Sequence, residues 1–131
     1  MTDPSATSAP SANLPAVVHL GNPGDSSNSG ESVGDGYREH LRVTSLSAGR
    51  FTATPGYNDQ QQPHTEDEIY YVLAGQAVLD IDGISHPVTA GSLAYVPRGV
   101  AHRFTQISTD LDVLVVFTRA NPQHKTPNGR R

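Results

Sequence analysis

Short runs of strand-forming residues, separated by turn residues, fill the chain between residues 37 and 119. The runs are rich in Val, Ile, Leu, Tyr, Phe and Thr, which favour extended backbone. They are HLRVTSLS (40–47), RFTAT (50–54), EIYYVLAG (68–75), QAVLDIDG (76–83), ISHPVTA (84–90), SLAYVPR (92–98), AHRFTQIS (101–108) and LDVLVVFTR (111–119). No segment keeps a 3.6-residue apolar period over the length of a helix. The pattern predicts an all-β antiparallel sandwich or barrel.

Turn residues support the same prediction. Asp82-Gly83 stands between two strand-like runs, and both residues tolerate the positive φ angles that a two-residue hairpin turn requires. Ala90-Gly91-Ser92 and Arg98-Gly99 mark two more reversals. The chain therefore reverses direction often enough to build an antiparallel sheet.

The two ends of the chain differ in composition from its middle. Residues 1–36 contain no aromatic side chain and consist mostly of Ser, Pro, Gly and Ala, so we expect a largely flexible N-terminal segment. Within it, LPAVVHL (14–20) is apolar enough to pair as a strand with another sheet or with a partner chain. Residues 120–131 lack an apolar pattern and are expected to form a C-terminal tail. One domain is expected over residues 37–119, since 131 residues are too few for two ordinary domains.

Charge and cysteine content exclude several classes of function. A net charge of -4 argues against nucleic acid or an anionic membrane as a partner, because both require a basic face. The chain has no cysteine, which excludes disulfides and thiolate metal sites and is consistent with a reducing cytoplasm. The N-terminus lacks the pattern of a signal peptide, and no apolar run reaches the length of a membrane span. We therefore expect a soluble cytoplasmic protein.

Two blocks of residues share a regular spacing. In the first, Gly56 is followed after five residues by Gln62, and then by His64, Glu68 and Gly75. The second block consists of Gly91, Pro97, Gly99, His102 and Gln106. These blocks resemble the paired motifs of the cupin superfamily, G-x5-H-x-H-x(3,4)-E-x6-G and G-x5-P-x-G-x2-H-x3-N. The resemblance implies a single antiparallel cupin-type β-barrel, also called a jelly roll, with the two motifs facing its interior.

The resemblance also implies a metal site. Its motif positions assign Gln62, His64, Glu68 and His102 as ligands of one divalent transition metal, and Gln106 as a residue that is not a ligand. Gln62 replaces the first motif histidine, which keeps the charge of the site but supplies a weaker oxygen donor. A site of nitrogen and oxygen donors suits iron, manganese, nickel, copper or zinc. The alternative is a pocket without metal, in which His64, Glu68 and His102 bond to one another.

Strand alternation assigns the neighbours of these residues to faces. Tyr70 and Val72 share the face of Glu68, and Phe104 and Gln106 share the face of His102, so all four are predicted to line the pocket. The opposite face of the strand at 68–75 is also apolar, and so is the run at 111–119. Since a monomer leaves such a face exposed, we expect a homodimer.

The resemblance is compatible with several functions. We favour an enzyme that uses one metal ion on a small organic molecule, which could be aromatic or polyketide-like, by dioxygenase-type chemistry. Glu68 would then act as ligand, as base, or as both. The alternatives are a metal-independent or zinc-dependent cyclase or isomerase, and a non-catalytic module that binds or senses a small molecule.

Overall fold

The computed structural model describes residues 14–22 and 34–118. This part of the chain is all-β, which confirms the predicted fold class, and it offers no helix long and apolar enough to cross a membrane. The predicted C-terminal tail and most of the segment 1–36 lie outside the described residues. The strands are β1 (Gly36–Arg42), β2 (Leu46–Ala53), β3 (Asp67–Ile81), β4 (Ile84–Thr89), β5 (Leu93–Val96) and β6 (His102–Thr118).

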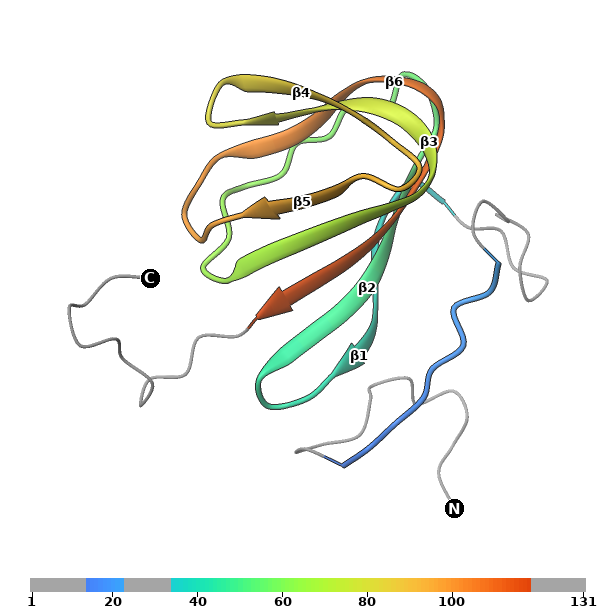
Figure 1. The fold of residues 1–131 in the computed structure, drawn as a ribbon, viewed down its shortest axis with the longest axis vertical. Helices are drawn as coiled ribbons and strands as arrows, with labels where there is room; N and C mark the ends of the chain where they lie inside the picture. Colours follow the sequence, from blue (N-terminus) through green and yellow to red (C-terminus); the bar gives the residue numbers. More distant parts are fainter. Residues whose placement is uncertain (1–13, 23–33, 119–131) are drawn as a thin grey trace.

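All strand pairs are antiparallel, and two long strands connect two layers (Figure 1). The first half of β3 pairs with β5 and with the second half of β6, which in turn pairs with β2 and so with β1. The second half of β3 pairs with β4 and with the first half of β6. Each long strand therefore leaves one layer and enters the other, which folds the sheet over the core.

The crossover of β3 depends on Gly75, at which the register between β3 and β6 shifts. Its φ is +97°, and a Cβ atom at this position would collide with the backbone of Asp110 and Leu111. Glycine thus lets β6 approach β3 closely at the bend, where any side chain would separate the strands.

The predicted hairpin at Asp82-Gly83 is confirmed. Ile81 pairs with Ile84 across the turn, and the φ angles of Asp82 and Gly83 are 53° and 81°. Positive φ at both central residues is the type I′ geometry, whose twist matches that of the flanking strands.

Strand boundaries differ from the sequence-based expectation in two ways. The run at 40–47 contains a reversal, because the Val43 N–H donates to the Leu46 carbonyl and separates β1 from β2. The runs at 68–75 and 76–83 join into β3, and those at 101–108 and 111–119 join into β6. Each join lies where β3 and β6 pair with shifted register, so both strands continue across it. This long-range pairing is not visible in a local pattern.

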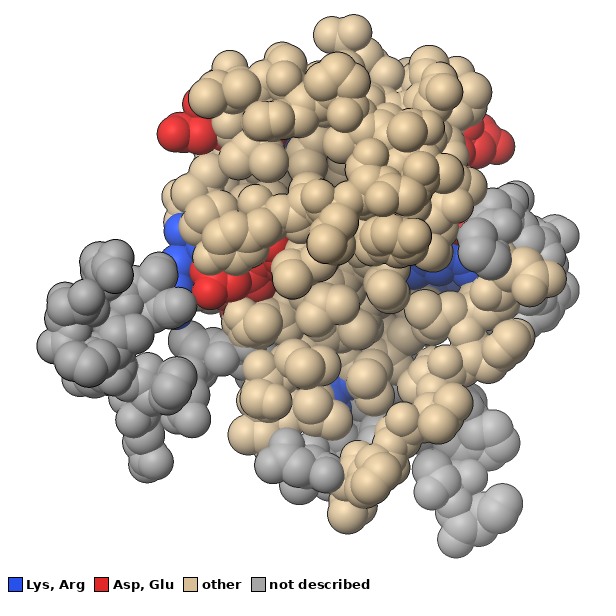
Figure 2. Space-filling view, viewed as in Figure 1, with Lys and Arg blue, Asp and Glu red and all other residues tan. Residues whose placement is uncertain are grey.

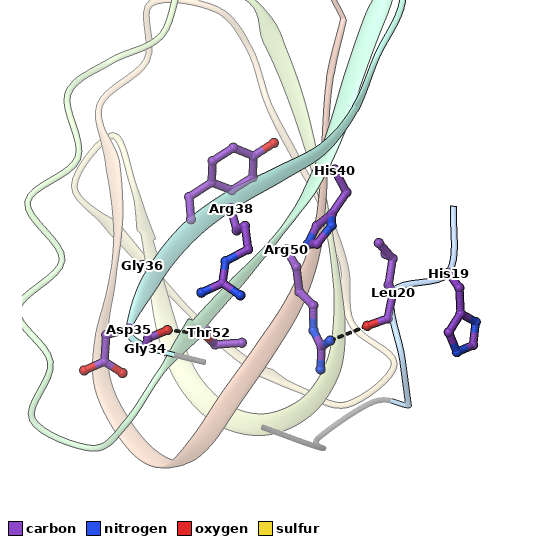
Figure 3. A pocket seen from close by; sticks show the side chains of 10 residues that line it. His19, Leu20, Gly34, Asp35, Gly36, Arg38, His40, Arg50 and Thr52 are labelled. Carbon is purple, nitrogen blue, oxygen red and sulfur yellow. Dashed lines mark hydrogen bonds between the residues drawn. The ribbon is translucent and has the colours of Figure 1, made fainter. Parts of the chain in front are cut away.

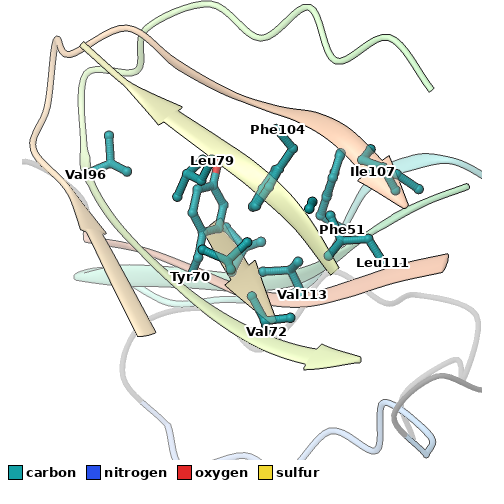
Figure 4. Packing of buried hydrophobic residues seen from close by; sticks show 13 residues of the cluster. Phe51, Tyr70, Val72, Leu79, Val96, Phe104, Ile107, Leu111 and Val113 are labelled. Carbon is teal, nitrogen blue, oxygen red and sulfur yellow. The ribbon is translucent and has the colours of Figure 1, made fainter. Parts of the chain in front are cut away.

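The core lies between the two layers (Figure 4). Phe104 stacks on Phe51 with ring centroids 5.4 Å apart and contacts Tyr70 at 4.9 Å. The fully buried aliphatic side chains around these rings come from β3, β5 and β6; they are Val72, Leu79, Val96, Leu111, Val113 and Val115.

An ion pair buried on β2 and β6 holds part of the N-terminal segment. Arg50 Nη2 lies 2.6 Å from Asp112 Oδ2, and Arg50 Nη1 donates to the Leu20 carbonyl at 2.6 Å (Figure 3). Residues 14–20 form no strand within the described part of the chain, and Val17 is almost fully exposed. Pairing of this segment with another chain stays a prediction.

We predict that Gly75→Ala destabilises the fold more than Gly91→Ala. Both glycines have a similar φ, +97° and +94°, but a Cβ at Gly91 would meet open space. The free energy of unfolding of the Gly91 variant should therefore fall only by the cost of backbone strain, about 1–3 kcal/mol. The Gly75 variant should lose more, because β6 must also move away from β3. Urea denaturation of both variants measures the difference, and equal losses would contradict the role assigned to Gly75.

Candidate metal centre

Three side chains with metal-binding chemistry meet inside the barrel. Glu68 on β3 is 2% exposed, His102 at the start of β6 is 6% exposed, and His64 in the β2–β3 loop is half-buried. One ligand atom from each residue lies within 4.8 Å of the other two. The structure therefore brings together three of the four residues assigned as ligands from the sequence.

Backbone contacts position these residues. Glu68 pairs with Val96 on β5, and the loop after β5 returns the chain to His102. In that loop the Gly99 N–H donates to the His64 carbonyl at 2.7 Å, which ties the loop that carries His64 to the one that precedes His102. Gly99 has a φ of +78°, so the motif glycine serves the turn rather than the chemistry.

His102 presents a nitrogen lone pair to Glu68. Its Nδ1–H donates to the Val100 carbonyl at 2.9 Å, so in the neutral ring Nε2 carries the lone pair. That Nε2 lies 3.0 Å from Glu68 Oε1, yet the two atoms form no hydrogen bond of acceptable geometry and both are fully buried. Since two electron-pair donors that face each other repel, this arrangement favours either a cation that both atoms can bind or protonation of His102 as the partner of Glu68.

The electrostatics of the site agree with this arrangement. Burial lowers the pKa of His102, but contact with Glu68, the hydrogen bond to Val100 and the negative charges of Glu68 and Asp59 outweigh it, and the pKa is raised. The pKa of Tyr70 is also raised, chiefly by burial and then by the negative charge of Glu68, so its phenol keeps its proton. The site thus attracts positive charge.

The donor set fits a divalent transition metal. Two imidazole nitrogens and one carboxylate oxygen form the set found in non-haem iron triads, and it also suits manganese, nickel, copper and zinc. A metal ion would neutralise the buried carboxylate of Glu68 and take the lone pair of His102 Nε2. These two atoms have no hydrogen-bond partner among the described residues, which is the observation that favours a metal.

Gln62 does not join this cluster. Its side chain is exposed and does not line the cavity beside His64. The neighbouring Gln61 points inward, and its Oε1 lies 3.3 Å from His64 Nε2 and 3.2 Å from the Tyr70 hydroxyl. The assignment of Gln62 as a ligand stays a prediction, but in this loop it is the side chain of the adjacent Gln61 that contacts His64. Motif spacing cannot determine the direction of side chains in an irregular loop.

The predicted pocket-lining residues have three different environments. Tyr70 lines the cavity, whereas Val72 and Phe104 are 2% and 1% exposed and belong to the core. The prediction that Gln106 faces inward is wrong. Its φ is +48°, the register of β6 against β3 shifts here, and Ile107 is buried in its place. Such a bulge adds a residue to one strand and reverses the alternation beyond it.

A cavity of about 330 Å³ opens beside Glu68 and His64. Its wall combines aromatic and polar side chains and contains no Lys or Arg among the described residues. The aromatic side chains come from β1, β2, β3, β6 and the β2–β3 loop; they are Tyr37, Phe51, Tyr57, Tyr70 and Phe117. The polar side chains are Asn58, Asp59, Gln60, Gln61, His64 and Glu68. A small, partly apolar molecule suits this wall.

Comparison with known proteins identifies a family and a fold. The family model described as "Cupin domain" matches residues 49–118. The crystal structure of an RmlC-like cupin from Shewanella frigidimarina superposes with a TM-score of 0.60 at 23% identity, over 70% of this chain and 84% of that one. At that identity the likeness shows the fold alone.

Two curated relatives differ in how much of their length is matched. An uncharacterised protein of Streptomyces coelicolor is 44% identical over 82 residues, which cover 63% of this chain and 78% of that protein. An acireductone dioxygenase of Gluconacetobacter diazotrophicus is 41% identical over 63 residues, 44% of this chain. This match covers only 35% of the dioxygenase.

We predict that the metal-free protein loses stability as the pH rises through the folded-state pKa of His102. Because this pKa is raised, the folded state binds a proton more tightly than the unfolded state does. The stability gained from this proton is therefore complete below the unfolded-state pKa of about 6.5. Above the folded pKa, Glu68 faces a neutral ring and the contribution is lost.

Thermal melts in chelator at several pH values, for the wild type and for His102→Gln, measure this effect. The stability difference between the two proteins should shrink with rising pH. Addition of a divalent transition metal at the higher pH should restore the lost stability of the wild type but not that of His102→Gln. A difference that does not change with pH would contradict the proposed proton between His102 and Glu68.

Proposed function

The chain belongs to the cupin family, and on this basis we propose that it is an enzyme that uses one divalent transition metal to act on a small organic molecule. The observation that carries the proposal is the pair of buried atoms, Glu68 Oε1 and His102 Nε2, that lie 3.0 Å apart without a hydrogen-bond partner. His64 Nε2 lies 3.9 Å from the same carboxylate oxygen, on the side where the cavity opens. A metal held here would be reached directly from the cavity.

The wall of the cavity favours a neutral aromatic or other partly apolar substrate. Five aromatic side chains contribute to it, and aromatic rings pack well against planar ligands. The charged side chains on the wall, Asp59 and Glu68, are both acidic. An anionic substrate would therefore depend on the metal for charge compensation, whereas a neutral phenol or ketone would not.

Glu68 and Tyr70 are the residues best placed to move protons. A bound metal would polarise a substrate oxygen, and dioxygenase-type chemistry is the reaction that we favour. Glu68 is the only carboxylate in the His64–Glu68–His102 cluster and is proposed as ligand and base. Tyr70, whose raised pKa keeps it protonated, can donate a hydrogen bond to a substrate oxygen.

The relative named as an acireductone dioxygenase is consistent with oxygenase chemistry. Its match covers about a third of that enzyme, so its substrate is not transferred to this chain. A cytoplasmic location, expected from the sequence, also stays a prediction.

A metal-independent cyclase or isomerase is the second candidate. The specific observation in its favour is the 3.0 Å contact between His102 and Glu68 together with the raised pKa of His102. An imidazolium beside a carboxylate can supply both an acid and a base to one substrate. Zinc in the same position would serve such a reaction without redox change.

Metal content separates the two candidates. Protein purified without a chelating column should contain a transition metal near one equivalent by elemental analysis. Glu68→Gln should lose the metal, because the site loses its only anionic donor. Above the folded-state pKa of His102, where its ion pair with Glu68 no longer contributes, the metal-free variant should melt within a few degrees of the metal-free wild type, since the amide has the same shape. Addition of metal at 100 times its Kd should stabilise only the wild type, by about 2.7 kcal/mol.

Two results would contradict the proposal. Wild-type protein that turns over a substrate without metal would favour acid–base catalysis by His102 and Glu68. Glu68→Gln protein that keeps both metal and turnover would remove Glu68 from the mechanism.

We also propose that two copies of the chain pair through the outer face of β3 and β5. Ile69 and Tyr71 on β3 are 39% and 41% exposed, and they lie opposite Tyr95 and Leu93 on β5, which are 53% and 71% exposed. These four side chains, here called the outer apolar face, extend toward the half-buried Val116 on β6. Figure 2 shows charged side chains in small separate groups, with broad uncharged areas between them.

A second copy of the chain is the partner that this face suits. Contiguous apolar side chains of this size are rarely left in water by a protein that works as a monomer. Because the face runs over two paired strands, a two-fold axis can place the same four side chains of another copy against it.

We predict that Leu93→Glu converts a dimer to a monomer of 13.9 kDa. A charge at Leu93, the most exposed side chain of the outer apolar face, should weaken association roughly 30-fold or more, the loss expected for a residue that contributes about 2 kcal/mol. Ile84→Glu is the matched control, because Ile84 is also exposed but lies in the β3–β4 hairpin. Light scattering at micromolar concentration gives the mass. A wild-type mass of 13.9 kDa would refute the dimer.

A further inference from the structure

Three consecutive glutamines precede His64, and the structure gives each a different environment. Gln60 and Gln62 are exposed, and Gln60 reaches only the wall of the cavity. Gln61 is half-buried, and both ends of its side-chain amide make hydrogen-bond contacts. Three residues of the same type therefore differ in environment only because of their positions in the loop.

Asp59 determines which end of the Gln61 amide faces the metal centre. Asp59 is 3% exposed, and its Oδ2 accepts the Phe104 N–H at 2.8 Å. The same oxygen lies 2.7 Å from Gln61 Nε2, so the amide nitrogen must face Asp59 as a donor. The Gln61 carbonyl oxygen then has to point away from Asp59.

The Gln61 oxygen points toward the His64–Glu68–His102 cluster. It lies 3.3 Å from His64 Nε2 and 3.2 Å from the Tyr70 hydroxyl. Ligand atoms about 2.0–2.2 Å from one metal are roughly 3.0–3.5 Å apart in tetrahedral or octahedral geometry. The separation of Gln61 Oε1 from His64 Nε2 therefore matches that of two donors to a single ion.

We propose that Gln61, and not Gln62, supplies the fourth protein donor to the metal, and that Asp59 positions it. An amide oxygen has two lone pairs, so it can bind the metal while it still accepts a hydrogen bond from Tyr70. When His64 Nε2 binds metal it gives up its proton, and its hydrogen bond to Gln61 is replaced by a shared ion. The inference rests on the proposed metal-dependent function.

A series of hydrogen bonds that begins at the backbone of β6 fixes the orientation of the Gln61 amide. The backbone of Phe104 holds Asp59, Asp59 holds the amide of Gln61, and Tyr70 holds the amide oxygen. Gln62 is exposed, and none of the hydrogen bonds found in the described part of the chain involves its side chain. A ligand whose orientation is set before the metal arrives binds more tightly than one that must be ordered on binding.

Matched alanine variants of the three glutamines test the inference. The full-length chain is stripped of metal and titrated with Co²⁺ alone by calorimetry, and the visible spectrum of the bound Co²⁺ is recorded. Gln61→Ala should weaken Co²⁺ binding roughly 10- to 100-fold and change the spectrum. Gln60→Ala and Gln62→Ala should bind within about threefold of the wild type and keep its spectrum. Thermal melts without metal show that the three variants are folded.

Each other outcome overturns the inference in a distinguishable way. If Gln62→Ala is the variant that loses affinity, the motif position is the ligand. If none of the three loses affinity while the wild type binds Co²⁺, the centre has three protein donors and the proposed function stands. If the folded wild type binds none of the divalent metals, both the inference and the proposed function fail.

Discussion

The antiparallel pairing of β3 with β6 is the interaction on which the rest of the structure depends. These are the two longest strands, and each has one half in each of the two layers. Gly75 permits the bend, because a side chain at this point would meet the backbone of β6. The same pairing buries the face that carries Glu68, Tyr70 and Val72. The core and the candidate metal centre are therefore two parts of one face of β3.

A buried carboxylate imposes the next constraint. Glu68 is removed from water at the inner end of the cavity, and a charge in that position is costly unless a cation compensates it. His102 meets the requirement with a proton at low pH or with a shared metal ion at higher pH. Because proton and metal compete for the same space, stability, metal affinity and pH are coupled at this centre.

Much of the fold could be predicted from local sequence. Strand composition, the Asp82-Gly83 turn and the alternation from Glu68 to Val72 follow from short-range rules. The prediction failed where pairing between distant strands decides the outcome. Two predicted runs merge into β6 because β3 pairs with both, and the bulge at Gln106 turns that side chain outward and buries Ile107. A local pattern does not show where the register between two distant strands shifts.

By itself, the sequence indicated which donors could meet, because its resemblance to the cupin motifs implied that His64, Glu68 and His102 face one interior, and the structure brings these three together. Only the tertiary structure decided how the loop before them is arranged. The choice between Gln61 and Gln62 depends on Asp59, which is buried against the backbone of Phe104, 45 residues away in the chain. Since that contact forms only when β6 closes the barrel, the direction of the neighbouring glutamine is a property of the folded state.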